Sequence, residues 1–172
     1  MYKLIALDMD GTTFNEEHEI SNEVKDSLFY AISKGVKIAF ISGREEFTVK
    51  EILKKLELDT YYGALNGSLI STTYSEVPKF VKSLEKKYIF DILDIVESNG
   101  FSPIVFLEDL IFTKDSNDEY VEIISKFINP KILRVKDIKE YIKNNNLEEK
   151  VLKIGICHEY DVLLRTEWDL RS

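Results

Sequence analysis

The chain has 172 residues, of which 44% are hydrophobic and 31% are charged, and its formal net charge at pH 7 is −8. This acidic balance argues against a nucleic acid or a membrane as partner, but it is compatible with a small phosphorylated molecule, because a metal ion and local N–H dipoles can reverse the potential inside one cleft. The single cysteine, Cys157, excludes an internal disulfide and favours the reducing cytoplasm, and no apolar run approaches membrane-spanning length.

The first part of the chain alternates predicted strands and helices. Residues 3–8 form a short, unbroken apolar run, which is typical of a strand buried on both faces. The pattern then predicts a helix over 20–35 with Ser21 as its N-cap, a buried strand over 36–42, a helix over 43–58, and a strand, an Asn-Gly turn and a return strand over 61–71. This alternation predicts a doubly wound α/β fold with a parallel sheet.

The pattern changes after about residue 75. It then predicts a long helix over 79–100, a hairpin over 101–114, a helix over 118–128, a strand over 131–135, a helix over 137–146, a strand over 150–159 and a helix from 160 to 170. Helices alternating with hairpins predict a separate α+β module. We therefore expect one domain over residues 1–75 and a second over residues 76–172.

Polar residues stand where each predicted strand of the first domain ends. Asp8, Ser42 and Asn66 occupy these positions. Because ligands of such sheets bind beyond the carboxyl ends of the strands, we expect the three side chains to lie close together around one ligand.

Asp8 and Asp10 point to the same side of an extended chain, because residues i and i+2 share a face. Asp8 is a candidate nucleophile for phosphorus, and Asp10 is a candidate proton donor and acceptor. Gly11 allows a sharp turn and a close approach to an anion. Two carboxylates and a phosphate repel one another, so Mg²⁺ is expected on the Asp8 carboxylate and the Asp10 carbonyl oxygen. The alternative is a simple strand-end turn capped by Asp.

The other strand ends supply candidate phosphate ligands. The Ser42 hydroxyl and the N–H groups of the expected helix start suit a phosphoryl oxygen, and Arg44 could reach a phosphate or carboxylate. Asn66 could bond the phosphoryl or leaving group. Each has a plainer interpretation: Ser42 as an ordinary N-cap, Arg44 as a surface arginine, and Asn66-Gly67 as a turn.

Three segments together resemble the haloacid dehalogenase superfamily of phosphatases. "DMDGTTF" matches its DxDGT signature, "FISGR" its second motif, and "ALNGSLI" the Asn-Gly segment of the Cof-type branch. The resemblance implies the N-terminal half of a haloacid dehalogenase-like (Rossmannoid) core followed by an α+β cap. It also implies a Mg²⁺-dependent phosphatase that acts on a small phosphorylated metabolite through an aspartyl phosphate. The implied catalytic and metal-binding residues are Asp8 and Asp10, and the implied phosphate-binding residues are Gly11, Thr12, Ser42, Gly43, Arg44, Asn66 and Gly67.

The chain lacks two later motifs of that family. A lysine motif and an acidic pair follow the cap in the family, and neither has a match here. We therefore expect a truncated or split member with little activity alone, whose incomplete core favours self-association through an open sheet edge. Two alternatives stay open: a phosphotransferase or phosphomutase of the same superfamily, and a non-catalytic binding fragment.

Overall fold

The computed structural model describes residues 2–15, 19–126, 128 and 131–163. The chain divides into two compact units, Met1–Val81 and Lys82–Ser172. This division falls later than the predicted boundary after residue 75, because Phe80 and Val81 form a strand of the first unit's sheet. The interpretation of the units as a core and a cap stays a prediction. None of the helices in the described ranges has the length and apolar character needed to cross a membrane.

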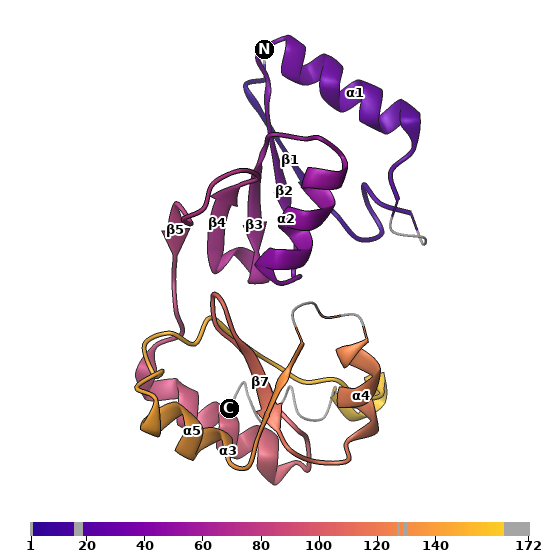
Figure 1. Cartoon of the computed structure of the whole chain (residues 1–172). Coiled ribbons are helices and arrows are strands. Elements are labelled where there is room, and N and C mark those ends of the chain that lie inside the picture. Colours follow the sequence, from indigo (N-terminus) through magenta and orange to yellow (C-terminus); the bar gives the residue numbers. More distant parts are fainter. Residues whose placement is uncertain (1, 16–18, 127, 129–130, 164–172) are drawn as a thin grey trace. The chain divides into compact units, whose positions relative to one another are not determined.

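The first unit contains a five-stranded sheet with the strand order β1-β2-β3-β4-β5 (Figure 1). Its strands are β1 (Leu4–Asp8), β2 (Lys37–Ile41), β3 (Tyr61–Ala64), β4 (Leu69–Thr72) and β5 (Phe80–Val81). β1, β2 and β3 are parallel, whereas β4 pairs antiparallel with β3 and β5 pairs antiparallel with β4. The predicted α/β class is therefore confirmed.

Two helices connect the parallel strands. They are α1 (Asn22–Ser33) and α2 (Glu46–Lys55). Ser21 caps α1 as predicted, since its Oγ accepts a hydrogen bond from Val24 N at 3.3 Å. Because both crossovers advance in the same direction and such crossovers are right-handed, both helices cover the same sheet face. That face carries Phe40 and Tyr62, which are fully buried, and the helices contribute the buried side chains of Leu28, Val49 and Leu53.

β1 differs from its prediction as a strand buried on both faces. Leu4 and Ile5 are 54% and 37% exposed, and Ile41 on the neighbouring β2 is 43% exposed. β1 is the end strand of the sheet, and α1 and α2 cover only one of its faces. The apolar run therefore predicted a strand correctly, but the prediction of burial was wrong because burial depends on neighbours that the described residues do not supply.

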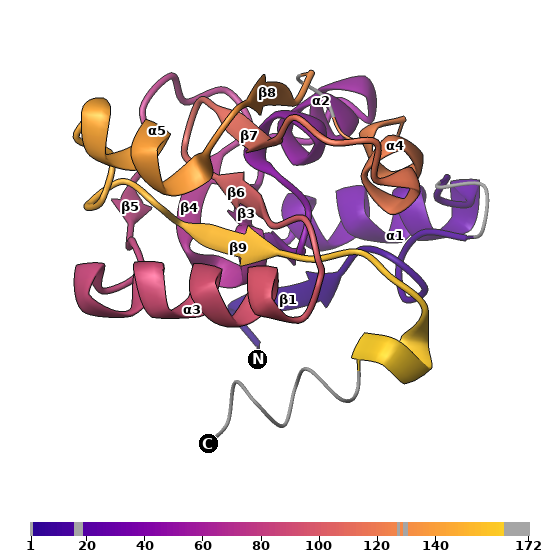
Figure 2. The same cartoon turned by 90° about the horizontal axis from the view of Figure 1, so that it is seen from below.

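The second unit contains a mixed sheet with the strand order β8-β7-β6-β9 (Figure 2). Its elements are α3 (Lys86–Ser98), β6 (Ile104–Phe106), β7 (Ile111–Lys114), α4 (Glu119–Ser125), β8 (Leu133–Val135), α5 (Ile138–Asn144) and β9 (Lys153–Gly155). Its core joins apolar residues of α3 and α5 to those of β6 and β7. Lys139 on α5 forms ion pairs with Asp94 and Glu97 on α3, the latter at 3.0 Å.

Two predicted helices have different bounds in the structure. The helix predicted from residue 79 begins at Lys86, because Phe80 and Val81 pair with β4 instead. The helix predicted over 43–58 is the shorter α2. The hairpin predicted over 101–114 is confirmed as β6 and β7. A helical turn occupies residues 160–163, and the rest of the helix predicted to 170 lies outside the described residues.

Phe40 tests the packing of the first unit. It is fully buried and meets Phe14 edge-on at a ring-centroid distance of 6.3 Å. We expect Phe40→Ala to lower the free energy of unfolding by about 3–5 kcal/mol, since it leaves a cavity as well as losing apolar burial. The matched control is Phe29→Ala on α1, which is 39% exposed and should cost no more than about 1 kcal/mol. Urea denaturation measures both, and equal losses would contradict the described core.

Candidate functional site

The loops that follow β2 and β3 are joined by backbone hydrogen bonds. Ser42 N donates to Gly63 O at 2.9 Å, and Asn66 N donates to Ser42 O at 3.1 Å. Leu65 N donates to Arg44 O at 2.8 Å. These bonds hold the segment "SGR" against the segment "LNG", so the structure brings together two of the three predicted strand ends.

The loop after β1 turns tightly around Asp8. Thr12 Oγ1 donates to Asp8 Oδ2 at 3.0 Å, and Thr13 Oγ1 donates to the Asp8 carbonyl oxygen at 2.6 Å. Gly11 has φ +71°, a conformation that favours glycine. Asp8 itself is exposed at the carboxyl end of the strand. The loop therefore presents one carboxylate to solvent while a neighbouring hydroxyl fixes one of its oxygens.

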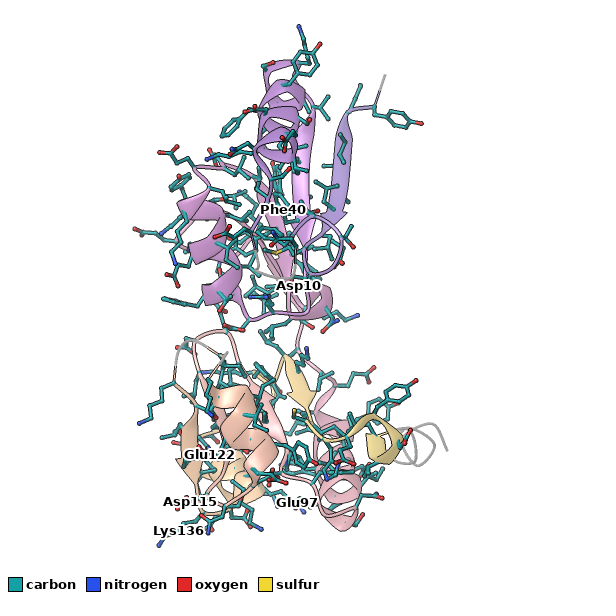
Figure 3. The ribbon with its side chains drawn as sticks, turned by 90° about the vertical axis from the view of Figure 1, so that its right-hand side faces the viewer. Asp10, Phe40, Glu97, Asp115, Glu122 and Lys136 are labelled. Carbon is teal, nitrogen blue, oxygen red and sulfur yellow. The ribbon has the colours of Figure 1, made fainter. Side chains whose placement is uncertain are left out.

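Asp10 joins the β1 loop to the β2 loop through Arg44. Arg44 Nε donates to Asp10 Oδ2 at 2.8 Å, and Arg44 Nη2 donates to Asp10 Oδ1 at 2.7 Å. Figure 3 labels Asp10 on its loop. This two-pronged pairing raises the pKa of Arg44, chiefly through the hydrogen bonds to Asp10. The two side chains are 25% and 44% exposed, so water screens the attraction, and its main effect is to fix geometry.

Ser42 lies before a loop and not at a helix start. Its side chain is buried, and its Oγ accepts a hydrogen bond from Arg44 N at 3.1 Å. α2 begins only at Glu46, because the carbonyl of Arg44 is bonded to Leu65 N and residues 43–45 are not helical. The expectation that Ser42 begins a helix, with helical N–H groups beside its hydroxyl, is therefore wrong. The loop supplies the N–H groups instead.

The Asn-Gly turn adopts a left-handed backbone. Leu65, Asn66 and Gly67 have φ of +49°, +59° and +90° within a short 3-10 turn. A Cβ built on Gly43 would lie 3.4 Å from Asn66 Nδ2, so the Asn66 amide packs directly against Gly43. The turn predicted from Asn-Gly is confirmed. The strained Leu65 was missed, because leucine rarely adopts this conformation and only its backbone bond to Arg44 explains it.

Asp8 and Asp10 provide the oxygen ligands that Mg²⁺ prefers. Within the described ranges, however, no group of three or more His, Cys, Asp or Glu residues is placed to hold a metal. The donor type of this pair therefore fits a hard cation, but a complete octahedral site needs further oxygen atoms, from water, a phosphate or other groups.

A hydrogen bond joins β3 to Glu46, the first residue of α2. Tyr62 on β3 donates through its hydroxyl to Glu46 Oε1 at 2.6 Å. Burial, and then the Glu46 carboxylate, raise the pKa of Tyr62, so its hydroxyl stays protonated at neutral pH. The sequence pattern had assigned no role to Glu46 or Tyr62.

A family model described as haloacid dehalogenase-like hydrolase matches residues 5–171. Among similar proteins, phosphatase YwpJ of Bacillus subtilis is 31% identical over 121 residues, which cover 70% of this chain and 42% of YwpJ. The putative phosphatase YxeH of B. subtilis is 45% identical over 78 residues, which cover 44% of this chain and 29% of YxeH. The chain thus spans less than half the length of these relatives.

Solved structures show the same fold over nearly the whole chain. A haloacid dehalogenase-like hydrolase from Bacteroides thetaiotaomicron aligns with a TM-score of 0.74 and 23% identity, covering 99% of this chain and 63% of that one. One from B. subtilis aligns with a TM-score of 0.76 and 23% identity, covering 98% of this chain and 66% of that one.

Asn66 allows its backbone and side-chain contributions to be separated. Asn66→Ala should lower the free energy of unfolding by about 1 kcal/mol, because the left-handed backbone conformation is unfavourable for alanine. Asn66→Gly should change it by less than about 0.5 kcal/mol, because glycine adopts this conformation freely. Both variants lose the amide beside Gly43. Urea denaturation checks the difference, and a larger loss for the glycine variant would contradict the described backbone.

Proposed function

Because this chain belongs to the haloacid dehalogenase-like hydrolases, we propose that it carries the nucleophile half of a phosphatase site, with Asp8 as the group that accepts the phosphoryl group. The observation that supports this most is the exposed Asp8 carboxylate at the end of β1, with one oxygen held by Thr12 and the Asp10–Arg44 pair in the same loop region. The proposed substrate is a phosphate monoester of a small metabolite, as in the Cof-type branch.

The proposed reaction has two steps. An Asp8 oxygen attacks phosphorus, the bond from phosphorus to the ester oxygen breaks, and Asp10 donates a proton to that departing oxygen, which leaves as the alcohol. Asp10 then removes a proton from a water molecule, whose oxygen attacks the same phosphorus. Phosphate leaves and the Asp8 carboxylate is restored. The reaction needs only Asp8, Asp10 and one water molecule, because the proton that Asp10 donates in the first step is replaced by the proton that it takes from water in the second.

The Asp10–Arg44 pair is arranged for the second step, in which Asp10 acts as a base toward water. With both Asp10 oxygens accepting hydrogen bonds from Arg44, the carboxylate is held in a fixed orientation as an acceptor, as a base must be. In the first step Asp10 gives up a proton, so a proton must first replace one of these two hydrogen bonds. We propose that Arg44 opens one bond when a phosphoryl oxygen arrives and so contacts the substrate as well as Asp10.

The proposed phosphate cradle combines the loops described above. Ser42 Oγ accepts from Arg44 N, which leaves its own O–H as a donor for a phosphoryl oxygen. The other proposed contacts come from Gly11, Thr12, Gly43, Asn66 and Gly67. Mg²⁺ would be held by the Asp8 carboxylate and the Asp10 carbonyl oxygen, and would neutralise charge between the nucleophile and the phosphate.

The names of relatives support a small substrate. YcsE of B. subtilis, a 5-amino-6-(5-phospho-D-ribitylamino)uracil phosphatase, is 41% identical over 68 residues, which cover 27% of its length. The second candidate function is phosphate binding without turnover. It is favoured by the absence, within the described residues, of a third acidic group that would complete a metal site.

Mass spectrometry of the Asp8 peptide distinguishes these functions. The 172-residue chain is incubated with Mg²⁺ and p-nitrophenyl phosphate, then quenched in acid. We expect an acid-stable phosphoryl adduct on Asp8 and slow release of p-nitrophenol, both needing Mg²⁺. Asp8→Asn should abolish the adduct, and Asp10→Asn should slow release by about 10²–10⁴-fold. Asp26→Asn, which changes an exposed carboxylate on α1, is the matched control.

An adduct that persists in Asp8→Asn would overturn the role of Asp8. Saturable binding of inorganic phosphate without any adduct or release would instead establish the binding-only function.

The two hydrogen bonds from the Arg44 guanidinium to Asp10, which we call the Arg44 fork, can be tested by a substitution that keeps the positive charge. Arg44→Lys cannot bond both Asp10 oxygens in the same plane, so we expect p-nitrophenol release to slow by about 10–100-fold, the worth of one or two charge-assisted hydrogen bonds. Arg134→Lys is the matched control, since Arg134 pairs with Glu122 in the second unit. Equal rates for Arg44→Lys and the unmodified chain would show that the fork has no part in the reaction.

A further inference from the structure

A small pocket lies in the first unit at the amino-terminal ends of β2 and β3, whereas the candidate site lies at their carboxyl ends. The pocket has a volume of about 220 Å³ and is bounded by the end of α1, the start of β2 and the loop that leads into β3. β2 rises by about 13 Å from Lys37, which lines the pocket, to Ile41, which precedes the Ser42 loop. The pocket is therefore separate from the candidate site.

Two side chains of opposite charge line this pocket. Lys37 is the first residue of β2, and Asp59 lies in the loop before β3. Both are exposed, and in the part of the chain that the structure describes neither forms an ion pair, with the other or with a third group. Lys37 Nζ lies 5.6 Å from the centroid of the Tyr61 ring, which also lines the pocket. One positive and one negative group are therefore both available to a ligand.

The end of α1 adds a second negative element. The lining includes Ile32 in the last turn of α1 and Gly35 just after the helix. The carbonyl end of a helix carries a partial negative charge that favours a cation, and the last turn of α1 contains no basic residue. Lys34, which follows the helix, has its Nζ 5.2 Å from the centroid of the Tyr30 ring. Together with Asp59, this helix end favours an ammonium group in the pocket.

Aliphatic side chains and one buried hydroxyl also belong to the pocket. Ile32, Val36 and Ile38 supply aliphatic surface. Thr60 lines the pocket and is only 4% exposed, and its Oγ1 has no hydrogen-bond partner among the described residues. A buried hydroxyl without a partner is unusual in a native protein, and a bound ligand is one way to satisfy it. The pocket thus combines two charges, an apolar wall and an unused hydroxyl.

We propose that this pocket binds a free α-amino acid with an aliphatic side chain. Such a molecule carries an ammonium and a carboxylate group on one carbon atom, so it pairs with Asp59 and Lys37 together, while its side chain contacts the aliphatic wall. The volume of about 220 Å³ is below that of pockets for drug-sized ligands and suits a molecule of this size. A simple anion, such as a phosphate ester, is repelled by Asp59, and a simple cation is repelled by Lys37.

Titration calorimetry with L-leucine as the probe tests the proposal without any phosphatase activity. We expect saturable binding with a dissociation constant of about 1 mM or lower, which a ligand of roughly nine non-hydrogen atoms can reach. Two analogues lack one charge each: 4-methylpentanoate has no ammonium group, and 3-methylbutylamine has no carboxylate. Each should bind at least about 10-fold more weakly, because one charged group of the pocket stays without a partner. Amide NMR shifts should change at residues 35–38 and 59–61 and stay unchanged at residues 8–13.

Three substitutions assign the contacts. Lys37→Gln and Asp59→Asn should each weaken L-leucine binding by at least about 10-fold. Their matched controls are Lys34→Gln and Glu57→Gln, which remove the same charges from exposed neighbours outside the pocket lining and should leave binding unchanged. Thr60→Val removes the hydroxyl at nearly constant shape, so it should not destabilise the free chain in urea denaturation, yet it should weaken L-leucine binding by about 5-fold.

Three results would overturn the proposal: no saturable binding of L-leucine at concentrations well above about 1 mM, an analogue with a single charge that binds as tightly as L-leucine, or unchanged binding in both Lys37→Gln and Asp59→Asn. Lys37 and Asp59 are exposed, so circular dichroism should show that their variants fold. If Thr60→Val does not fold, the two charge variants and the analogues decide. None of these measurements involves Asp8, so the outcome does not depend on the proposed phosphatase reaction.

Discussion

Parallel pairing of β1, β2 and β3 is the constraint on which the candidate site depends. Because the three strands run in one direction and in close register, their carboxyl ends lie at one edge of the sheet and their polar loops must meet there. Backbone bonds then hold the Ser42 loop against the Asn66 turn, and the Arg44 fork links both to Asp10. Chemistry that needs several groups around one phosphorus atom requires this kind of convergence.

The same topology explains why part of the unit's apolar surface is exposed. Consecutive right-handed crossovers in one direction place both helices on one face, so the other face and the β1 edge have no cover within the described residues. The site and this surface therefore meet at the end of β1. Asp8 stands at the end of this strand, where its carboxylate is exposed to solvent.

The local structure of individual elements could be predicted from residue patterns. The strand runs, the Ser21 cap, the hairpin at residues 101–114 and the Asn-Gly turn were all predicted, because each depends on neighbours close in sequence. Three predictions that depended on distant partners were wrong. Burial of β1 needs covering elements, the start of α2 is delayed by a bond from Leu65, and Phe80 joins a strand because β4 is beside it.

The sequence by itself determined the α/β class, the strand ends at which polar residues stand, and the family to which "DMDGTTF" and "FISGR" point. Only the tertiary structure decided that Arg44 pairs with Asp10, that Asn66 packs on Gly43, and that β1 is an exposed edge. The physical reason is the range of the forces involved: propensity and periodicity act over a few residues, whereas ion pairs, side-chain packing and the covering of a sheet join residues far apart in the chain.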